Sequence, residues 1–405
     1  MKTSLTILMI HQHYFPEMTG TGRRTRELAE CFVRNGHNVT VITSFPREFR
    51  SMPNAHCESY EILNNVNVYR IKTLFDIGNN VFFRMLSYAS FVLQSLMLSY
   101  RKSRECQIII SIAPLSSGII GALLQIMTKK YHHFDVPDIL PDLGISAGMI
   151  KNKFIIYLMY KLEKWVYNHS SSVSAITHGQ IDNIVNKGVI EEKISYIPDW
   201  VDDTFFLKNS AKYKQQVAKM LDYSNKILIS FIGNIGALQN PEVFVEVMKS
   251  LDAEGLDDFQ FLFIGDGIML PSLKERVAEA GLQNITFVGR VEREYIPGYM
   301  HQSDILVANY LSNEYLDICI PGKLFEYAVS NKPIIMGSQG EAKNLIERYN
   351  LGIAVAPSNV NAFKEAILAI KDEKYTYNPD MEKFIDDYSL PKVVAKYNNI
   401  FLDIN

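Results

Sequence analysis

A lysine and a glutamate stand three residues apart in a segment with the pattern of a strand, a loop and a helix. Residues 304–310 (DILVANY) form an apolar run typical of a buried parallel strand, and Pro321 then suits a first helical turn, where its missing N–H costs nothing. The predicted helix carries Lys323 and Glu326 and ends near Asn331. A helix that begins just after a strand directs free N–H groups and a positive dipole end toward a bound anion.

The chemistry that this segment favours is recognition of a ligand with adjacent hydroxyl groups. Glu326 lies one turn inside the helix, and a carboxylate there accepts hydrogen bonds from the two hydroxyls of a ribose. The alternative is a glutamate that only faces solvent, as an isolated helical glutamate usually does. The surrounding motifs distinguish the two interpretations.

The order and spacing of these motifs resemble those of family 4 glycosyltransferases. The similar segments, in chain order, are TGTGRRTRELAECFVRNGHNVTVITSFPR, DILPDLG, IPDWVDDTFF, IGNIGALQNPE, FLFIGDG, ITFVGRV, PGKLFEYAVSNKPII and GEAKNLIERYNLGIAVAP. The resemblance covers nearly the whole chain and looks closest to bacterial enzymes that build O-antigen, colanic acid or capsule units, including L-fucosamine transferases. It implies an α/β chain of the GT-B fold, with two Rossmann-like, doubly wound parallel-sheet domains facing across a cleft.

Length and composition agree with two α/β domains. A chain of 405 residues that is 47% hydrophobic is too long for one ordinary core. The formal net charge of −3 gives no general attraction to nucleic acid. The four cysteines are far apart, which indicates neither a zinc site nor a disulfide framework and fits a reducing cytosol. The first apolar run is too short for a signal peptide.

The motifs also predict where the domains divide. We expect an N-terminal acceptor-binding domain over residues 1–205 and a C-terminal nucleotide-sugar-binding domain over residues 206–380. The linker is expected near residues 202–209. Residues 381–405 are predicted to form a helix, which in relatives crosses back to the first domain.

A glycine-containing loop, residues 11–22, follows the first strand, at the sheet edge where open α/β sheets bind ligands. Gly20 and Gly22 begin a partial dinucleotide fingerprint, but its third glycine is replaced by Thr25 and no acid ends the next strand, so we exclude NAD binding. The resemblance instead implies backbone approach to the acceptor at Gly20 and to the donor phosphate at Gly22. The resemblance also makes two adjacent arginines candidate contacts to the acceptor, Arg23 and Arg24. The alternative is that both are solvated residues of the helix.

Asp138, in the DILPDLG motif, matches an aspartate that relatives carry at the mouth of the cleft. It is predicted to orient an acceptor hydroxyl or to take its proton, the alternative being a turn or helix-capping residue. His132 and His133 lie near the end of the same strand, but residues 136–137 occupy the place where relatives carry a histidine. Neither histidine is therefore assigned a role.

Three residues after the first strand of the second domain are predicted to lie against the donor diphosphate: Gly233, Asn234 and Gly236. Relatives carry an arginine and a lysine in this loop, where this chain has Asn234 and Gln239. We therefore expect Lys323 and Arg290, with the helix N-terminus, to neutralise the leaving phosphates.

The family's paired-glutamate motif places its first glutamate at Ile318, and this chain has Asp317 beside that position. The altered contact to the donor sugar suits a deoxy or amino sugar such as N-acetyl-L-fucosamine. Glu341, at the start of a later helix, is predicted to contact the donor sugar, the alternative being that it only complements the helix dipole.

The resemblance thus implies a retaining, metal-independent glycosyltransferase that moves a sugar from a UDP-sugar to a polyprenyl-diphosphate-linked acceptor. The chain has no Asp-x-Asp triplet and no His/Cys cluster for a metal, and no cofactor beyond the nucleotide sugar is expected. One alternative, a GT-B nucleotide-sugar epimerase, would need clustered carboxylates and histidines. The other is an inactive scaffold subunit, suggested by the replaced loop residues, against which the retained Lys323, Glu326 and Asp138 count.

Two segments of the first domain indicate binding to a membrane surface. Residues 85–100 are strongly apolar but shorter than the roughly 20 residues of a spanning helix. Residues 151–167 mix aromatic and aliphatic residues with four lysines, a composition that suits anionic headgroups: Lys151, Lys153, Lys161 and Lys164. We expect a cytoplasmic protein held peripherally on the inner membrane, the alternative being that both helices simply pack within the domain.

Overall fold

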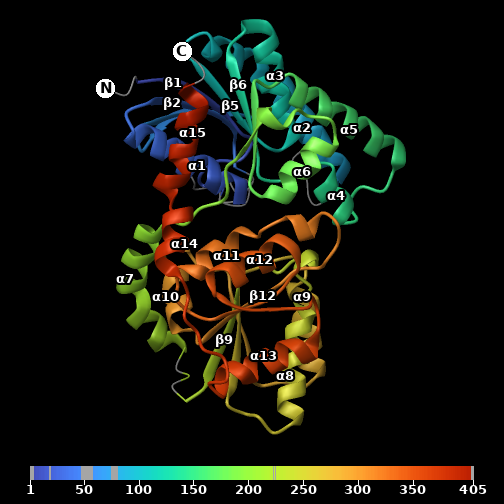
Figure 1. Cartoon of the computed structure of the whole chain (residues 1–405), viewed down its shortest axis with the longest axis vertical. Coiled ribbons are helices and arrows are strands. Elements are labelled where there is room, and N and C mark those ends of the chain that lie inside the picture. Colours follow the sequence, from blue (N-terminus) through green and yellow to red (C-terminus); the bar gives the residue numbers. More distant parts are fainter. Residues whose placement is uncertain are drawn as a thin grey trace. The chain divides into compact units, whose positions relative to one another are not determined.

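The computed structural model describes residues 4–17, 20–46, 58–73, 81–221, 223 and 225–402. The chain divides into two compact units. Unit 1 comprises residues 1–198 together with 393–405, and unit 2 comprises residues 199–392. Each unit is a sheet with helices packed against it (Figure 1).

Unit 1 contains an eight-stranded sheet of order β3-β4-β2-β1-β5-β6-β7-β8, in which only β3 is antiparallel to its neighbour. The strands are β1 (Thr6–Ile10), β2 (Asn38–Ser44), β3 (Tyr60–Leu63), β4 (Val66–Ile71), β5 (Ile108–Ile112), β6 (Tyr131–Val136), β7 (Ser172–Ala175) and β8 (Ile194–Tyr196). The central strand β5 is buried along its whole length, as expected of a parallel strand covered on both faces.

The helices described between these strands are α1 (Gly20–Arg34), α2 (Val81–Ser103), α3 (Leu115–Thr128), α4 (Asp142–Ser146), α5 (Lys153–Asn168) and α6 (His178–Asn186). The start of α5 is fixed by Asn152, whose side chain accepts hydrogen bonds from the N–H groups of Phe154 and Ile155 at 3.0 and 3.2 Å. The apolar segment over residues 85–100 lies within α2, which packs on α3 and on the sheet.

Unit 2 contains a six-stranded parallel sheet of order β11-β10-β9-β12-β13-β14. Its strands are β9 (Ile227–Ile232), β10 (Phe259–Ile264), β11 (Ile285–Gly289), β12 (Ile305–Asn309), β13 (Ile334–Gly337) and β14 (Gly352–Val355). Alternate residues of β9 enter separate cores, with Ile229 and Phe231 in one and Leu228 and Ile232 in the other. The expected doubly wound parallel sheets are therefore confirmed in both units.

The helices after residue 199 are α7 (Asp203–Leu221), α8 (Glu242–Ala253), α9 (Leu270–Glu279), α10 (Ile296–Gln302), α11 (Gly322–Ala328), α12 (Gly340–Tyr349), α13 (Val360–Lys371), α14 (Met381–Tyr388) and α15 (Leu390–Leu402). Helix α11 ends three residues before the predicted Asn331. The Ser330 hydroxyl donates to the Tyr327 carbonyl at 2.6 Å and Asn331 has a φ of 54°, so the chain leaves the helix there.

The residues expected to link the domains form the first turns of α7. The chain changes unit between Pro198 and Asp199, and the Asp202 side chain accepts a 2.9 Å hydrogen bond from the N–H of Phe205 at the start of that helix. At the other end of the chain, residues from Val393 onward belong to unit 1, where Tyr397 of α15 packs edge-on against Phe32 of α1.

Candidate functional site

Each sheet has one point at which the strand order reverses. In unit 1 this switch point lies between β1 and β5, and in unit 2 it lies between β9 and β12. Open α/β sheets bind ligands outside the carboxyl ends of the strands at such a point, because the connections there leave in opposite directions. Apart from Gly22, which lies in unit 1, the predicted donor residues belong to unit 2, and the predicted acceptor residues belong to unit 1.

Lys323 lies at the switch point of unit 2. Its Nζ is buried and has no hydrogen-bond partner within the described part of the chain. The ammonium lies 4.0 Å from the ring centroid of Phe231, in β9, and 5.9 Å from that of Tyr310, just after β12. Burial lowers the pKa of Lys323 to about 7, although the nearby Glu326 carboxylate opposes this shift. A buried lysine without a fixed anion is suited to receive one from a ligand.

The loop after β9 approaches Lys323 through a glycine. A Cβ at Gly233 would lie 3.2 Å from the lysine Nζ, and its φ of +130° is one that other residues rarely adopt. Gly265, after β10, packs on the same loop, because a Cβ there would lie 2.0 Å from the Gly233 carbonyl oxygen. The structure therefore places the predicted phosphate loop directly beside the predicted phosphate-neutralising lysine.

A tyrosine that the sequence interpretation did not single out fixes α11 at this position. The N–H of Ile232 donates to the Tyr327 hydroxyl at 2.7 Å, and that hydroxyl donates to the Ile232 carbonyl at 3.0 Å. This pair of bonds joins α11 to the last residue of β9 and holds Glu326 one residue away. A tyrosine on the buried face of a short helix signals such a bond, because a buried hydroxyl needs a partner.

Asn234 and Gly236 complete the loop after β9. Asn234 is exposed, whereas a Cβ at Gly236 would lie 2.6 Å from the Asn234 Nδ2 and 2.7 Å from the Gln239 Oε1. The Gln239 Oε1 is itself buried without a hydrogen-bond partner in the described residues. Neutral amides therefore occupy the positions where the family resemblance implied positive charge, and the buried Nζ of Lys323, in α11, lies beside this loop.

Asp317 and Glu341 are brought together at the start of α12. Asp317 belongs to the short 3-10 helix over residues 316–318, and the Ser312 hydroxyl donates to its Oδ2 at 2.9 Å. Gly340 makes this approach possible, because its φ is +59° and a Cβ there would lie 1.9 Å from the Asp317 carbonyl oxygen. Glu341 is half-buried in the first turn of α12.

Arg290 lies further from the switch point. It is exposed and follows β11, the edge strand, two strands from β9. Its neighbour Gly289 accepts a 2.8 Å hydrogen bond from the N–H of Gly265, which packs on the loop at Gly233. Among the predicted donor-site residues, Lys323 thus lies directly against the loop at Gly233, and Arg290 follows the edge strand of the sheet.

The switch point of unit 1 is occupied by a histidine that the sequence interpretation did not assign. His11 follows β1, and its Nδ1 lies 3.1 Å from the carbonyl oxygen of Ile112, at the end of β5. Its Nε2 lies 3.1 Å from the Thr21 hydroxyl. Burial lowers the pKa of His11 to about 3, so the ring is neutral, Nδ1 carries the proton, and Nε2 accepts from Thr21.

A cavity of about 520 Å³ opens beside this histidine, within unit 1. Asp138, His13 and Thr21 lie in its lining, each just after a strand or at the start of α1. The His13 Nδ1 lies 3.1 Å from the Glu17 carboxylate. Most of the other lining residues are apolar and come from α2, α3, α4 and α5. The structure thus places Asp138 at the polar edge of a cavity whose other walls are mostly apolar.

The two adjacent arginines of α1 have different environments. Arg23 is half-buried, whereas Arg24 is 3% exposed and makes a bidentate ion pair with Asp135, with bonds of 2.8 and 3.1 Å. Burial alone would raise the pKa of Asp135, but the Arg24 guanidinium lowers it below its usual value. Arg24 also donates to Tyr397 at 3.4 Å. Its guanidinium therefore joins α1, β6 and α15 of unit 1 rather than facing the cavity.

The two glycines at the start of α1 also differ in burial. Gly20 is exposed, with no atom near the position of an added Cβ, whereas Gly22 is buried. Both lie in the first turn of α1, so the helix begins at Gly20, within the residues 11–22 that we expected to form a loop. His132 and His133 are fully buried within unit 1, and burial lowers their pKa values to about 3 and about 4.

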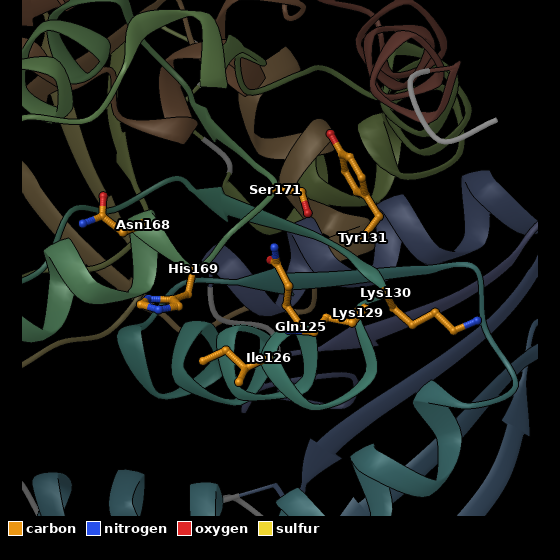
Figure 2. A pocket seen from close by; sticks show the side chains of 8 residues that line it. All are labelled: Gln125, Ile126, Lys129, Lys130, Tyr131, Asn168, His169 and Ser171. Carbon is orange, nitrogen blue, oxygen red and sulfur yellow. The ribbon is translucent and has the colours of Figure 1, made fainter.

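A second, polar hollow of about 460 Å³ lies at the opposite end of unit 1 (Figure 2). Lys129 and Lys130 precede β6, and Ser171 precedes β7, so the hollow is at the amino ends of the strands. We do not assign it to the functional site, because the strand ends that bind ligands in such sheets are the carboxyl ends.

The described residues set two further limits. Across them, no group of three or more His, Cys, Asp and Glu side chains could hold a metal ion. No helix among them is both long enough and apolar enough to span a bilayer.

Comparison with known proteins identifies the class to which this arrangement belongs. Residues 19–200 match the glycosyl transferase 4-like domain, and residues 226–373 match the glycosyl transferases group 1 family. The chain therefore belongs to the family 4 glycosyltransferases, and the expected GT-B fold is confirmed. The sequence resemblance rested on the segments that these two matches cover.

Individual proteins are similar over most or part of the chain. The putative colanic acid biosynthesis glycosyl transferase WcaI of Escherichia coli is 25% identical over 381 residues, covering 90% of this chain and 91% of WcaI. An α-1,4-N-acetyl-D-galactosaminyltransferase of Campylobacter jejuni, named for a diNAcBac-PP-undecaprenol substrate, is 23% identical over 44% of this chain and 48% of its own. The crystal structure of Anabaena HepE with UDP and glucose superposes with a TM-score of 0.73 at 14% identity, covering 98% of this chain and all of HepE.

Proposed function

We propose that the protein is a retaining, metal-independent glycosyltransferase of surface polysaccharide assembly. It takes a sugar from a UDP-linked donor and transfers it to an acceptor carried on a polyprenyl diphosphate, with no cofactor beyond the nucleotide sugar. The observation that carries the proposal is the buried Nζ of Lys323, which has no hydrogen-bond partner in the described residues and lies beside the Gly233 loop. An unpaired buried ammonium there matches a diphosphate leaving group.

In this proposal the donor binds to unit 2. Glu326 accepts hydrogen bonds from the ribose hydroxyls, and the Gly233 loop lies against the diphosphate. HepE, which shares the fold, was crystallised with UDP and glucose, and this supports UDP as the nucleotide. Asp317 and Glu341, which lie together, contact the sugar. The aspartate at the place of the family's first glutamate favours a deoxy or amino sugar such as N-acetyl-L-fucosamine.

The reaction breaks the bond between the sugar C1 and the β-phosphate oxygen of UDP. Negative charge then accumulates on that oxygen, and Lys323, with Arg290 contributing from the edge strand, stabilises it more in the transition state than in the ground state. The acceptor hydroxyl forms the new bond to C1 on the face that UDP leaves and loses its proton. Asp138 orients that hydroxyl or receives the proton.

The acceptor side of the proposal is supported by the names of relatives and by unit 1. WcaI is named for colanic acid biosynthesis, and the Campylobacter enzyme for an undecaprenyl-diphosphate-linked glycan. Such an acceptor stays in the bilayer, so the protein acts on the cytoplasmic surface of the inner membrane. Four exposed lysines on or just before α5 would contact anionic headgroups: Lys151, Lys153, Lys161 and Lys164.

A panel of nucleotide sugars tests the enzymatic proposal. The protein is incubated with each donor and with membrane lipid extract, and UDP release and sugar incorporation are followed by mass spectrometry. We expect UDP release with one donor and a new glycolipid. A converted nucleotide sugar without UDP release would indicate an epimerase, and binding without turnover of any donor would indicate a scaffold subunit.

Vesicle flotation tests the membrane proposal separately. We expect the protein to float with anionic vesicles at low salt, and the simultaneous change of the four lysines to glutamine to reduce flotation. A protein that stays wholly at the bottom of the gradient at low salt would contradict membrane association.

A further inference from the structure

We propose that the cavity beside Asp138 in unit 1 binds the first isoprene units of the acceptor's prenyl chain, so that the enzyme recognises the lipid as well as the glycan. This inference rests on the proposed function, because it takes the lipid-linked acceptor from it. It assigns a binding role to the apolar lining residues of this cavity, which the transfer chemistry itself does not require.

The lining of the cavity separates polar from apolar groups. His13, Thr21 and Asp138 follow strands or begin α1, so they lie at the carboxyl edge of the sheet. Most of the remaining lining residues are apolar and come from helices, with Val92 from α2 and Met159 from α5 among them. A sugar diphosphate suits the polar edge, and a hydrocarbon chain, which makes no hydrogen bonds, suits the walls.

An apolar stripe leads from the cavity along α5. Leu162 lines the cavity and is 37% exposed, and Leu158 and Phe154, at successive four-residue spacings on the same helix face, are 49% and 68% exposed. The exposure of apolar side chains thus increases with distance from the cavity. A soluble domain gains nothing from such a stripe, whereas a chain that passes from the cavity into a bilayer would be covered along its whole length.

The charges around the stripe fit a lipid as the occupant rather than a peptide. Lys153, Lys161 and Lys164 of α5 are exposed, and the Lys161 Nζ lies 5.5 Å from the centroid of the Tyr157 ring. The one acidic residue of α5, Glu163, is buried and paired with Lys187 at 2.8 Å. The exposed charges of α5 are therefore all positive, which complements the phosphates of an anionic membrane and of the acceptor.

Binding of farnesyl diphosphate, which carries three isoprene units, tests the inference with the full chain. The titration is done calorimetrically in saturating UDP, so that the donor site of unit 2 is already filled, and inorganic diphosphate is the matched probe without a chain. We expect farnesyl diphosphate to bind at least about tenfold more tightly than inorganic diphosphate, because burial of a few methylene groups has that effect.

Two tryptophan substitutions on α2 separate the cavity from its surroundings. Ala89 lines the cavity and is exposed, so Ala89→Trp fills the space without disturbing a core. We expect it to weaken farnesyl diphosphate binding about tenfold and to leave inorganic diphosphate and UDP unchanged. Leu93, one turn along and 77% exposed, does not line the cavity, so Leu93→Trp is the matched control and should bind farnesyl diphosphate like the wild type.

Equal affinity of the wild type and Ala89→Trp for farnesyl diphosphate would overturn the inference, as would equal weakening by Leu93→Trp. A farnesyl diphosphate carrying a photoreactive diazirine gives a second readout, because its label should map to α2 and α5. Labelling confined to other segments would also overturn it. These outcomes can be distinguished from failure of the proposed function. If glycolipid forms but Ala89→Trp binds farnesyl diphosphate like the wild type, the proposed enzyme activity stands and the cavity assignment is rejected. If Ala89→Trp weakens binding but no glycolipid forms with any donor, the cavity assignment stands and the proposed enzyme activity is rejected.

Discussion

The two switch points place different titratable groups in equivalent positions. In unit 2 the position holds Lys323, whose Nζ is buried without a hydrogen-bond partner in the described residues, and burial lowers its pKa to about 7. In unit 1 it holds His11, whose two ring nitrogens both have partners, and burial lowers its pKa to about 3. The first site keeps a cation that a ligand can pair, whereas the second is neutral and satisfied.

The same contrast extends to the neighbouring charges. In unit 1 the buried guanidinium of Arg24 is already paired with Asp135, and the cavity that Asp138 lines is mostly apolar. In unit 2 the loop positions that carry cations in relatives hold Asn234 and Gln239. The Arg24 charge of unit 1 therefore stabilises the fold, whereas in unit 2 the Nζ of Lys323 has no hydrogen-bond partner in the described residues and lies where the proposed reaction needs it. The following predictions test this contrast.

The largest expected effect is on stability and comes from unit 1. Arg24→Met leaves the buried Asp135 carboxylate without its partner, and breaking such a pair costs about 3–5 kcal/mol of unfolding free energy. Urea denaturation measures the loss, and Arg23→Met is the control, with an expected change below about 1 kcal/mol. UDP affinity should stay unchanged in both variants. Equal destabilisation by the two substitutions would contradict the structural role of Arg24.

Removing the cation of unit 2 should instead affect turnover. Lys323→Met keeps the apolar stem but loses the charge that stabilises the departing diphosphate, so kcat should fall about 10²–10³-fold, the usual effect of losing one transition-state donor. UDP binding should weaken less, because the charge on the phosphate increases only as the bond breaks. Thermal unfolding of the free variant should occur at a higher temperature, since an unpaired buried ammonium is removed. Unchanged kcat would remove Lys323 from the mechanism.

Removal of the proposed ribose contact should have a smaller effect than removal of the Lys323 charge. Glu326→Ala should weaken UDP binding by about 1.5–3 kcal/mol, the range for a hydrogen bond to a charged group. Glu341→Ala, which removes a carboxylate proposed to contact only the sugar, is the control and should leave UDP affinity unchanged. Calorimetric titration with UDP measures both. A Glu326→Ala protein that binds UDP like the wild type would contradict the assignment of the donor site to α11.

The pH dependence of UDP binding follows from the same lysine. With a pKa of about 7, Lys323 is neutral above that pH and must take up a proton to pair with the diphosphate, so affinity should fall about tenfold per pH unit above pH 7. Titration in two buffers of different ionisation enthalpy detects the proton uptake, and Lys323→Met should abolish it.

The stability of the free protein should change in the opposite direction with pH. The folded pKa of Lys323 lies below the ordinary value of 10.5, so the unfolded chain binds the extra proton between about pH 7 and 10.5, and this group makes stability rise with pH there. The penalty is full below pH 7. A wild type and a Lys323→Met variant with parallel stability curves across this window would show that the ammonium is not buried in solution.

The smallest expected effect is that of chelation. If Lys323 replaces a divalent ion, excess EDTA should leave the transfer rate within about twofold of the untreated value, because no metal neutralises the diphosphate. Complete loss of activity that manganese restores would mean that unit 2 does not neutralise its ligand with its own side chains.

Much of the fold could be predicted from local patterns. The apolar run at 304–310 became β12, and the proline-led segment after it became α11, with Lys323 and Glu326 in its first turns. Strand and helix periodicity is a property of neighbouring residues, so a single chain displays it. The exact end of α11, at Ala328 and three residues before Asn331, coincides with a hydrogen bond from the Ser330 hydroxyl to the Tyr327 carbonyl, which no local pattern shows.

What each charged residue does was decided by the tertiary structure. Arg23 and Arg24 are neighbours of the same type, and only folding brings Asp135 from 111 positions away to one of them. One signal was available, since Arg24 is four and eight residues from Leu28 and Phe32 and so shares the buried face of α1. The sequence determined which residues could carry charge. Whether a charged group is paired within the protein or left for a ligand to pair depends on its burial and on partners distant in the chain. Only the folded sheet and its switch points bring those together.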